Sequence, residues 1–270
     1  MIHTRMVIYY GPKHGNDESE WEDGAAGFPG DPAMGRCTRL AVADGATQGF
    51  GSARWAQQLV TGFVGADGEQ GVRPPALSPD ALHGWFEAMR HRWQHDPRMA
   101  EANDLQRFKL AEVGSFATFL GCELRDLDGP RPRWHAVALG DTVLFQVRDH
   151  ELIAQFPQLA AADFGFNPDG VPTKPDALAG MLDRLLVGEG ELAEGDVLYV
   201  ATDAFAQWMV EADQRGGRSL WKALAGLDHP DTFHRLVADR RRSGEMTNDD
   251  VTLLRVQTAA AQPAYVVVCL

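Results

Sequence analysis

The chain has 270 residues, of which 44% are hydrophobic and 23% are charged. This balance is typical of a folded globular protein and excludes a disordered, collagen-like or coiled-coil chain. The 38 acidic and 25 basic residues give a formal net charge of -13, the wrong sign for binding phosphate backbones or anionic lipid. We therefore expect neither nucleic acid nor a membrane as a partner.

The cysteines and the N-terminal segment indicate the compartment. Cys37, Cys122 and Cys269 lie far apart and form no CxxC pair, so neither a disulfide framework nor a zinc site is expected. No apolar run reaches the roughly 20 residues of a membrane span, and the first residues lack the apolar stretch and cleavage site of a signal peptide. These observations predict a cytoplasmic protein.

Short runs of alternating or continuous apolar residues predict eight strands along the chain. They are expected at residues 6–10, 40–43, 115–124, 134–139, 143–148, 197–201, 251–257 and 265–270.

Helices are predicted in two blocks between these strands. The first block has a helix beginning near Ser52 and a second with Ser78 as N-cap and Pro79 at its first position. The second block comprises residues 205–212, 220–224 and 232–242. Because helices come in blocks and do not alternate strictly with strands, the pattern predicts an α+β fold and not a doubly wound parallel sheet. No linker composition divides the chain, so we expect one domain spanning residues 1–270.

Acidic residues mark the ends of several predicted strands. Asp44, Asp141 and Asp203 follow strands, whereas Asp249 and Asp250 precede one. A single Asp beside Gly is typical of a turn. Carboxylates at four strand ends of one sheet, however, would repel one another unless cations lay between them. Oxygen ligands without Cys or His favour Mg²⁺ or Mn²⁺, so the group predicts a metal site.

Six segments carry further information. They read EWEDGAAG (20–27), LAVADGATQGFGSARWAQQL (40–59), GSFATFLG (114–121), ALGDTVLFQVRD (138–149), GDVLYVATDAFAQWM (195–209) and NDDVTLLRV (248–256). In order and wording they resemble the metal-dependent serine/threonine protein phosphatases of type 2C, and the DGAT and TDA wording is closer to a bacterial branch. The resemblance spans about residues 16–257 and implies a four-layer α-β-β-α sandwich, in which two antiparallel sheets are flanked by helices.

The resemblance also implies a set of metal ligands. By motif match, Asp44 bridges two Mn²⁺ or Mg²⁺ ions, and the backbone carbonyl of Gly45 lies on one of them. Glu22 and Asp23 match the acidic pair that holds one ion directly or through water.

The remaining implied ligands lie further along the chain. Asp203 and Asp249 match the aspartates on the other ion, and Asp141 matches an aspartate of a third, weaker site. Gln207 stands where the family usually has another Asp, which puts the third ion in doubt.

Three further positions depart from the family pattern. Asp250 replaces the amide of the usual DN pair, Ala46 stands where many eukaryotic members have histidine, and Glu18 stands where an arginine is expected. The leaving-group acid and the phosphate-binding arginine of the family are therefore not identified.

The activity implied by the resemblance is hydrolysis of phosphoserine and phosphothreonine on proteins, by two-metal activation of a bridging water. The partner would be a phosphorylated protein, the enzyme acting as counterpart of a Ser/Thr kinase in bacterial signalling. Two alternatives stay open: a catalytically weakened module that binds phosphorylated partners, and a phosphatase acting on a small phosphorylated metabolite.

Overall fold

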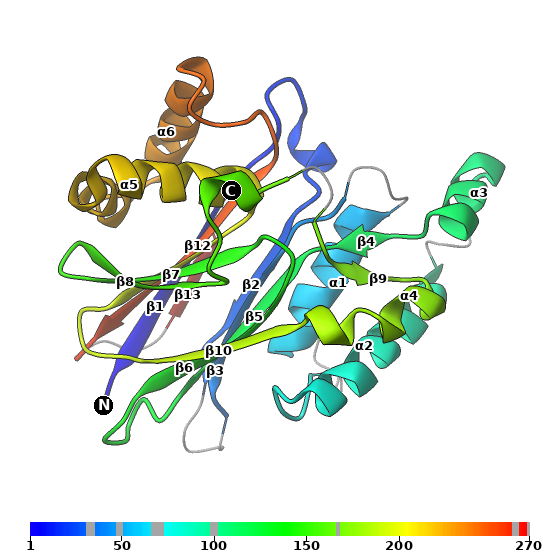
Figure 1. The fold of residues 1–270 in the computed structure, drawn as a ribbon, viewed down its shortest axis with the longest axis horizontal. Helices are drawn as coiled ribbons and strands as arrows, with labels where there is room; N and C mark the ends of the chain where they lie inside the picture. The colour runs from blue at the N-terminus through cyan, green and yellow to red at the C-terminus, as the bar shows by residue number, and fades with distance from the viewer. Residues whose placement is uncertain are drawn as a thin grey trace.

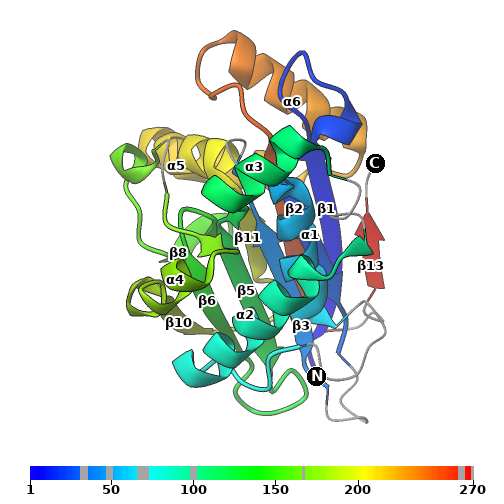
Figure 2. The same cartoon turned by 90° about the vertical axis from the view of Figure 1, so that its right-hand side faces the viewer.

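The computed structural model describes residues 1–30, 36–46, 51–65, 73–97, 102–165, 168–260 and 265–268. Two large β-sheets pack face to face, and helices cover the outer face of each sheet (Figures 1 and 2). This arrangement confirms the predicted four-layer α-β-β-α sandwich and the α+β fold class.

Sheet A contains both ends of the described chain, because β1 lies between strands from the C-terminal part. Its spatial order is β13 (Tyr265–Val268), β1 (His3–Gly11), β12 (Val251–Ala259), β11 (Val197–Ala201), β7 (Val143–Arg148) and β8 (Glu151–Phe156). Its neighbouring strands are antiparallel except for β13, which runs parallel to β1.

Sheet B is antiparallel throughout its described strands. Its order is β10 (Leu186–Glu191), β6 (Arg133–Leu139), β5 (Phe119–Arg125), β3 (Thr38–Ala43) and β2 (Gly24–Phe28). A separate two-stranded ladder pairs β4 (Phe116–Ala117) with β9 (Val171–Pro172).

The alternation of side chains along each strand produces three apolar cores. On β12, Leu254 and Val256 face the other sheet, whereas Leu253 faces the helices over sheet A. The helices over sheet A are α5 (Asp203–Ala225) and α6 (Pro230–Arg242). The helices over sheet B are α1 (Ser52–Val64) and α2 (Pro79–Gln94). Shorter elements are η1 (Glu18–Glu20), α3 (Asp104–Glu112), η4 (Ala161–Asp163), α4 (Pro175–Ala179) and η5 (Leu182–Arg184).

Two predicted elements differ from those observed. The single strand expected over residues 115–124 is divided into β4 and β5, because the backbone of Thr118 turns to bond Asp44. The helices expected at 205–212 and 220–224 are parts of α5, which contains a non-helical residue at Gly216. Among the described residues, no helix has the length and apolar character needed to cross a bilayer.

Candidate metal centre

The strand ends that carry the predicted ligands meet at one end of the sandwich. Gly11 pairs with Val251 and Gly24 pairs with Ala43, so the ends of β1 and β3 lie beside the starts of β12 and β2. The end of β11 lies beside the start of β7, since Ala201 pairs with Val143. The segments carrying Glu22, Asp23, Asp44, Asp141, Asp203, Asp249 and Asp250 leave or enter the sheets at these points.

Asp23 is the buried centre of this group, with only 2% of its surface exposed. Its Oδ2 accepts hydrogen bonds from the hydroxyls of Thr252 at 2.7 Å and Thr202 at 3.0 Å. Within the described part of the chain, no donor reaches its buried Oδ1. The carboxyl group of Asp44 lies within hydrogen-bonding reach of Asp23. Because two ionised carboxylates are both acceptors, this contact needs a shared proton or a cation.

The electrostatics of the pair support this interpretation. Burial raises the pKa of Asp23 above its usual range, the Thr252 hydroxyl lowers it in part, and the charges of Asp250 and Asp203 raise it further. Burial likewise raises the pKa of Asp44 well above its usual range, and the charges of Asp23 and Asp203 add to the effect. The folded protein therefore resists ionising both carboxyl groups unless positive charge is added.

The backbone around Asp44 is held by β4 and its continuation. The N–H of Thr118 donates to the Asp44 carbonyl at 2.9 Å, and the N–H of Asp44 donates to the Thr118 hydroxyl at 3.2 Å. Only glycine fits at position 45, because a Cβ there would lie 2.5 Å from the carbonyl oxygen of Glu22. Gly45 thus lets the loop after β3 pass directly against the loop that carries Glu22 and Asp23.

Asp141 approaches the same group from the turn before β7. Gly140 has a φ of 100°, and a Cβ there would lie 2.3 Å from the carbonyl oxygen of Asp169, so the turn requires glycine. Asp141 is 4% exposed, and neither carboxylate oxygen has a partner at ordinary hydrogen-bond geometry among the residues that the structure describes. Burial raises the pKa of Asp141 to about 7, with the charge of Asp203 as the next cause, although the nearby N–H of Gly165 lowers it.

Asp203 and Asp249 lie nearer the surface. The Oδ1 atom of Asp203, at the start of α5, accepts the N–H of Ala204 at 2.6 Å. Burial and then the charge of Asp249 raise the pKa of Asp203. The Asp249 side chain is 41% exposed, and its Oδ1 lies 3.0 Å from the ammonium nitrogen of Lys13.

Asp250 positions the surrounding backbone. Its two carboxylate oxygens accept the N–H of Lys13 at 2.8 Å and the N–H of Glu22 at 2.7 Å. The departure from the family's amide at this position therefore has a structural reason, because an amide has one acceptor oxygen where two are used here.

Lys13 is a site residue that sequence reasoning missed. Its ammonium nitrogen lies 3.7 Å from Glu22 Oε2 as well as 3.0 Å from Asp249 Oδ1. Burial lowers the pKa of Lys13, but the hydrogen bond that its ammonium donates to Asp249 and the charges of Asp249, Asp250 and Glu22 outweigh that effect and raise it. The side chain is therefore a cation at the edge of the carboxylates. Its partner Asp249 lies near the other end of the sequence, so no local pattern marked Lys13 as part of the site.

Gln207 is engaged elsewhere. Its Nε2 donates to the carbonyl of Ala161 at 3.1 Å, which joins α5 to η4. This bond gives Gln207 a structural role, at the position where the family usually has an aspartate for the third metal ion.

The gathered groups suit hard divalent cations in their chemistry. They offer carboxylate oxygens, and among the described residues no donor reaches Asp23 Oδ1 or either oxygen of Asp141 at ordinary hydrogen-bond geometry. Across the described ranges, however, no three His, Cys, Asp or Glu side chains converge in ligating geometry. Like charges repel one another, so these carboxylates are not expected to converge on one point without a bound cation. The chemistry of the donor set therefore fits such ions. The ligand role of each residue stays a prediction.

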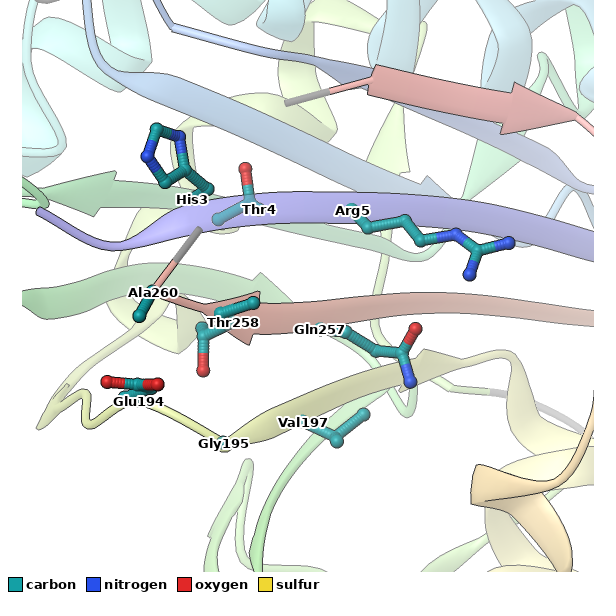
Figure 3. Close-up of a pocket in the computed structure, with 10 residues that line it drawn as sticks. His3, Thr4, Arg5, Glu194, Gly195, Val197, Gln257, Thr258 and Ala260 are labelled. Atoms are coloured by element: carbon teal, nitrogen blue, oxygen red, sulfur yellow. The ribbon is translucent and has the colours of Figure 1, made fainter. Parts of the chain in front are cut away.

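A groove of about 540 Å³ lies elsewhere (Figure 3). It is lined by His3, Thr4 and Arg5 of β1, by the end of β12, and by Glu194, Gly195 and Val197 at the start of β11. These residues lie at the opposite ends of their strands from Gly11, Val251 and Ala201. The groove is therefore separate from the candidate metal centre.

Comparison of the sequence with protein-family models and with curated proteins finds no match. Solved structures do match. The catalytic domain of the serine/threonine protein phosphatase PstP, solved in complex with two manganese ions, has a TM-score of 0.61 and 17% identity, covering 96% of this chain and 100% of that one. A bacterial serine phosphatase has a TM-score of 0.62 and 11% identity, covering 96% of this chain and 99% of that one. The serine/threonine phosphatase of S. agalactiae has a TM-score of 0.57 and 14% identity, covering 94% of this chain and 99% of that one.

At these identities the likeness establishes the fold. The chain has the fold of type 2C phosphatase domains, so the resemblance derived from the six motifs is confirmed at that level.

Proposed function

We propose that this chain is a metal-dependent phosphomonoester hydrolase that removes phosphate from phosphoserine and phosphothreonine on proteins. The observation that carries the proposal is the buried carboxyl group of Asp23 beside the half-buried carboxyl group of Asp44, at the strand ends of a phosphatase fold. Among the described residues no donor reaches Asp23 Oδ1. We also treat residues 1–270 as one phosphatase-like domain, which the pairing of β1 with β12 supports.

Two Mn²⁺ or Mg²⁺ ions would be held by Asp23, Asp44, Asp203 and Asp249, with Glu22 and the Gly45 carbonyl completing the set and Asp141 serving a third, weaker position. When bound, such ions would activate a water for in-line attack on phosphorus and offset the charge of the phosphoryl oxygens.

The chain's own groups prepare the site in three ways. The hydroxyls of Thr202 and Thr252 fix the orientation of the Asp23 carboxylate. Thr118 fixes the backbone of Asp44 from the side of β4. Asp250 holds the loop of Glu22 against the loop that begins β12. These bonds keep the carboxylates close in spite of their mutual repulsion, which is the preorganisation that catalysis requires.

The substrate class rests on the neighbours, since the matched structures are described as serine or serine/threonine phosphatases. A phosphorylated protein is accordingly the proposed partner, with a Ser/Thr kinase as the opposing enzyme and the cytoplasm as the compartment.

The test is a phosphatase assay on the chelator-treated protein, before and after addition of millimolar Mn²⁺. Substrates are phosphoserine and phosphothreonine peptides, a panel of small phosphorylated metabolites, and p-nitrophenyl phosphate. Asp239→Asn, an exposed carboxylate on α6 paired with Arg242, is the matched control. We expect Mn²⁺-dependent release of phosphate from the peptides, unchanged in the control variant.

Two results would contradict this proposal. Binding of phosphopeptides without turnover at any Mn²⁺ concentration would identify the weakened binding module. Turnover of a metabolite with high efficiency, and of peptides only at the rate of the aryl phosphate or below, would move the substrate class away from proteins.

A further inference from the structure

The loop that carries Lys13 is anchored by its backbone. Besides the bond from Lys13 N–H to Asp250, the N–H of His14 donates to Asn248 Oδ1 at 2.7 Å, and Asn248 Nδ2 donates to the His14 carbonyl at 3.3 Å. Arg241 adds a bond to the carbonyl of Pro12 at 3.0 Å. The Cα of Lys13 is therefore fixed beside the candidate metal centre, and a flexible four-carbon stem joins it to the ammonium group.

The side chain of Lys13 and those of its two partners are partly exposed. The Lys13 side chain is 22% exposed, and its partners Glu22 and Asp249 are 23% and 41% exposed. Ion pairs that reach solvent contribute little to stability, so this ammonium can exchange partners at small cost.

Two other ion pairs, which are formed by arginines, differ from the pairs of Lys13. Arg39 bonds Glu123 with both side chains almost fully buried, and Arg148 bonds the fully buried Asp196 through two nitrogens. Each uses a planar guanidinium against a carboxylate, which is the arrangement suited to permanent pairing. Lys13 instead places a compact point charge on a flexible stem, and neither of its carboxylate partners is fully buried.

The surroundings favour a cation at this position. Seven carboxylates gather at this end of the sandwich, from Glu22 to Asp250, and a phosphomonoester dianion must approach them. A side-chain cation at the rim would offset part of the repulsion and bind phosphoryl oxygens by charge-assisted hydrogen bonds.

We propose that Lys13 is the phosphoryl-binding side chain of this site, its ammonium moving from Asp249 to the non-bridging oxygens of the substrate phosphate. The inference rests on the proposed function and adds to it the residue that binds the substrate's charge. No bond is formed or broken by Lys13 in this role.

Two variants separate this role from a structural ion pair. Lys13→Met removes the charge and keeps most of the side-chain length, whereas Lys13→Arg keeps the charge. Lys222→Met, at an exposed position in the last turn of α5, is the matched control. Each protein is examined at saturating Mn²⁺ for KM and kcat on p-nitrophenyl phosphate and for the affinity of inorganic phosphate by calorimetry. The affinity for Mn²⁺ and the melting temperature are also measured.

For Lys13→Met we expect phosphate affinity to fall by about tenfold or more and KM to rise in parallel, because a charge-assisted hydrogen bond is lost. Its Mn²⁺ affinity should stay equal or become tighter, since a cation that competes for Glu22 and Asp249 is gone. Lys13→Arg should recover most of the phosphate affinity, and Lys222→Met should match the wild type.

Unchanged phosphate affinity and KM in Lys13→Met would overturn the inference. So would a fall in melting temperature and Mn²⁺ affinity without a change in phosphate affinity, which is the result of a purely structural ion pair. Absence of hydrolysis in the wild type would refute the proposed function alone, because phosphate binding by calorimetry still tests Lys13 directly.

Discussion

The bonds made by Asp250 lead to a quantitative prediction for Asp250→Asn, the change that restores the family's amide. Asp250 is 3% exposed, and its two oxygens accept the N–H groups of Lys13 and Glu22 at 2.8 and 2.7 Å. An asparagine side chain offers one oxygen and one NH₂ group, so in either orientation one backbone N–H faces another donor. The substitution therefore costs at least one charge-assisted hydrogen bond, about 2 kcal/mol.

An opposing effect exists in the metal-free protein. The charge of Asp250 raises the pKa of both Asp23 and Asp203, so neutralising it relieves some repulsion. Saturating Mn²⁺ removes that relief, because bound cations already compensate the carboxylates. The lost hydrogen bond then dominates, and the melting temperature should fall by about 4–8 °C in Mn²⁺ and by less in chelator.

The assay is thermal unfolding followed by circular dichroism, with Asp239→Asn as control for loss of one exposed carboxylate on α6. We expect the control to stay within about 0.5 kcal/mol of the wild type. A melting temperature of Asp250→Asn in Mn²⁺ that equals or exceeds that of the wild type would refute the positioning role of Asp250.

Three further predictions follow from the same contacts. First, burial raises the pKa of Asp23, Asp44 and Asp141, the last to about 7. The stability of the folded protein that depends on these carboxyl groups being protonated is therefore complete below about pH 4 and is lost as pH rises through the raised pKa values. The melting temperature in chelator should thus fall from about pH 5 to about pH 8 and should not fall in saturating Mn²⁺; equal slopes in both conditions would contradict this. Second, Thr252→Val removes the 2.7 Å bond to Asp23 and should weaken Mn²⁺ binding by about tenfold or more in calorimetry, whereas Thr232→Val at a half-buried position on α6 should not. Third, Ala46 cannot donate a proton and Gln207 donates to Ala161, so aryl phosphates should react faster than alkyl phosphoserine by about 10² or more. Rates independent of leaving-group pKa, with chemistry rate-limiting, would reveal an acid elsewhere in the site.

Much of the fold was predictable because its central strands are apolar. The strands at 143–148 and 197–201 were predicted with the bounds observed, and most of their side chains are buried. The strands that sequence reasoning missed include β2 and β10, which read GAAGF and LVGEGE and lie at the edges of sheet B. Edge strands need fewer apolar residues, so their glycines and charges are typical of loops in the sequence.

The candidate site was predictable only in part. Acidic residues beside strand ends gave a local signal for Asp44, whereas Asp23 was implied only by the family resemblance. The two carboxyl groups lie side by side in the structure, and their role as metal ligands stays a prediction. The positions of Lys13, Thr252 and Thr118 depend on pairing between strands that are far apart in the chain. No local pattern marks a lysine or threonine as a partner of a carboxylate that lies on another strand.

The most direct test of the metal-centre hypothesis is a calorimetric titration of Mn²⁺ into the chelator-treated protein, with wild type and Asp44→Ala measured side by side. We predict binding of two ions to the wild type and loss of at least one of them in Asp44→Ala, because Asp44 is proposed to hold both. No binding to the wild type, or the same binding in both proteins, would contradict the account.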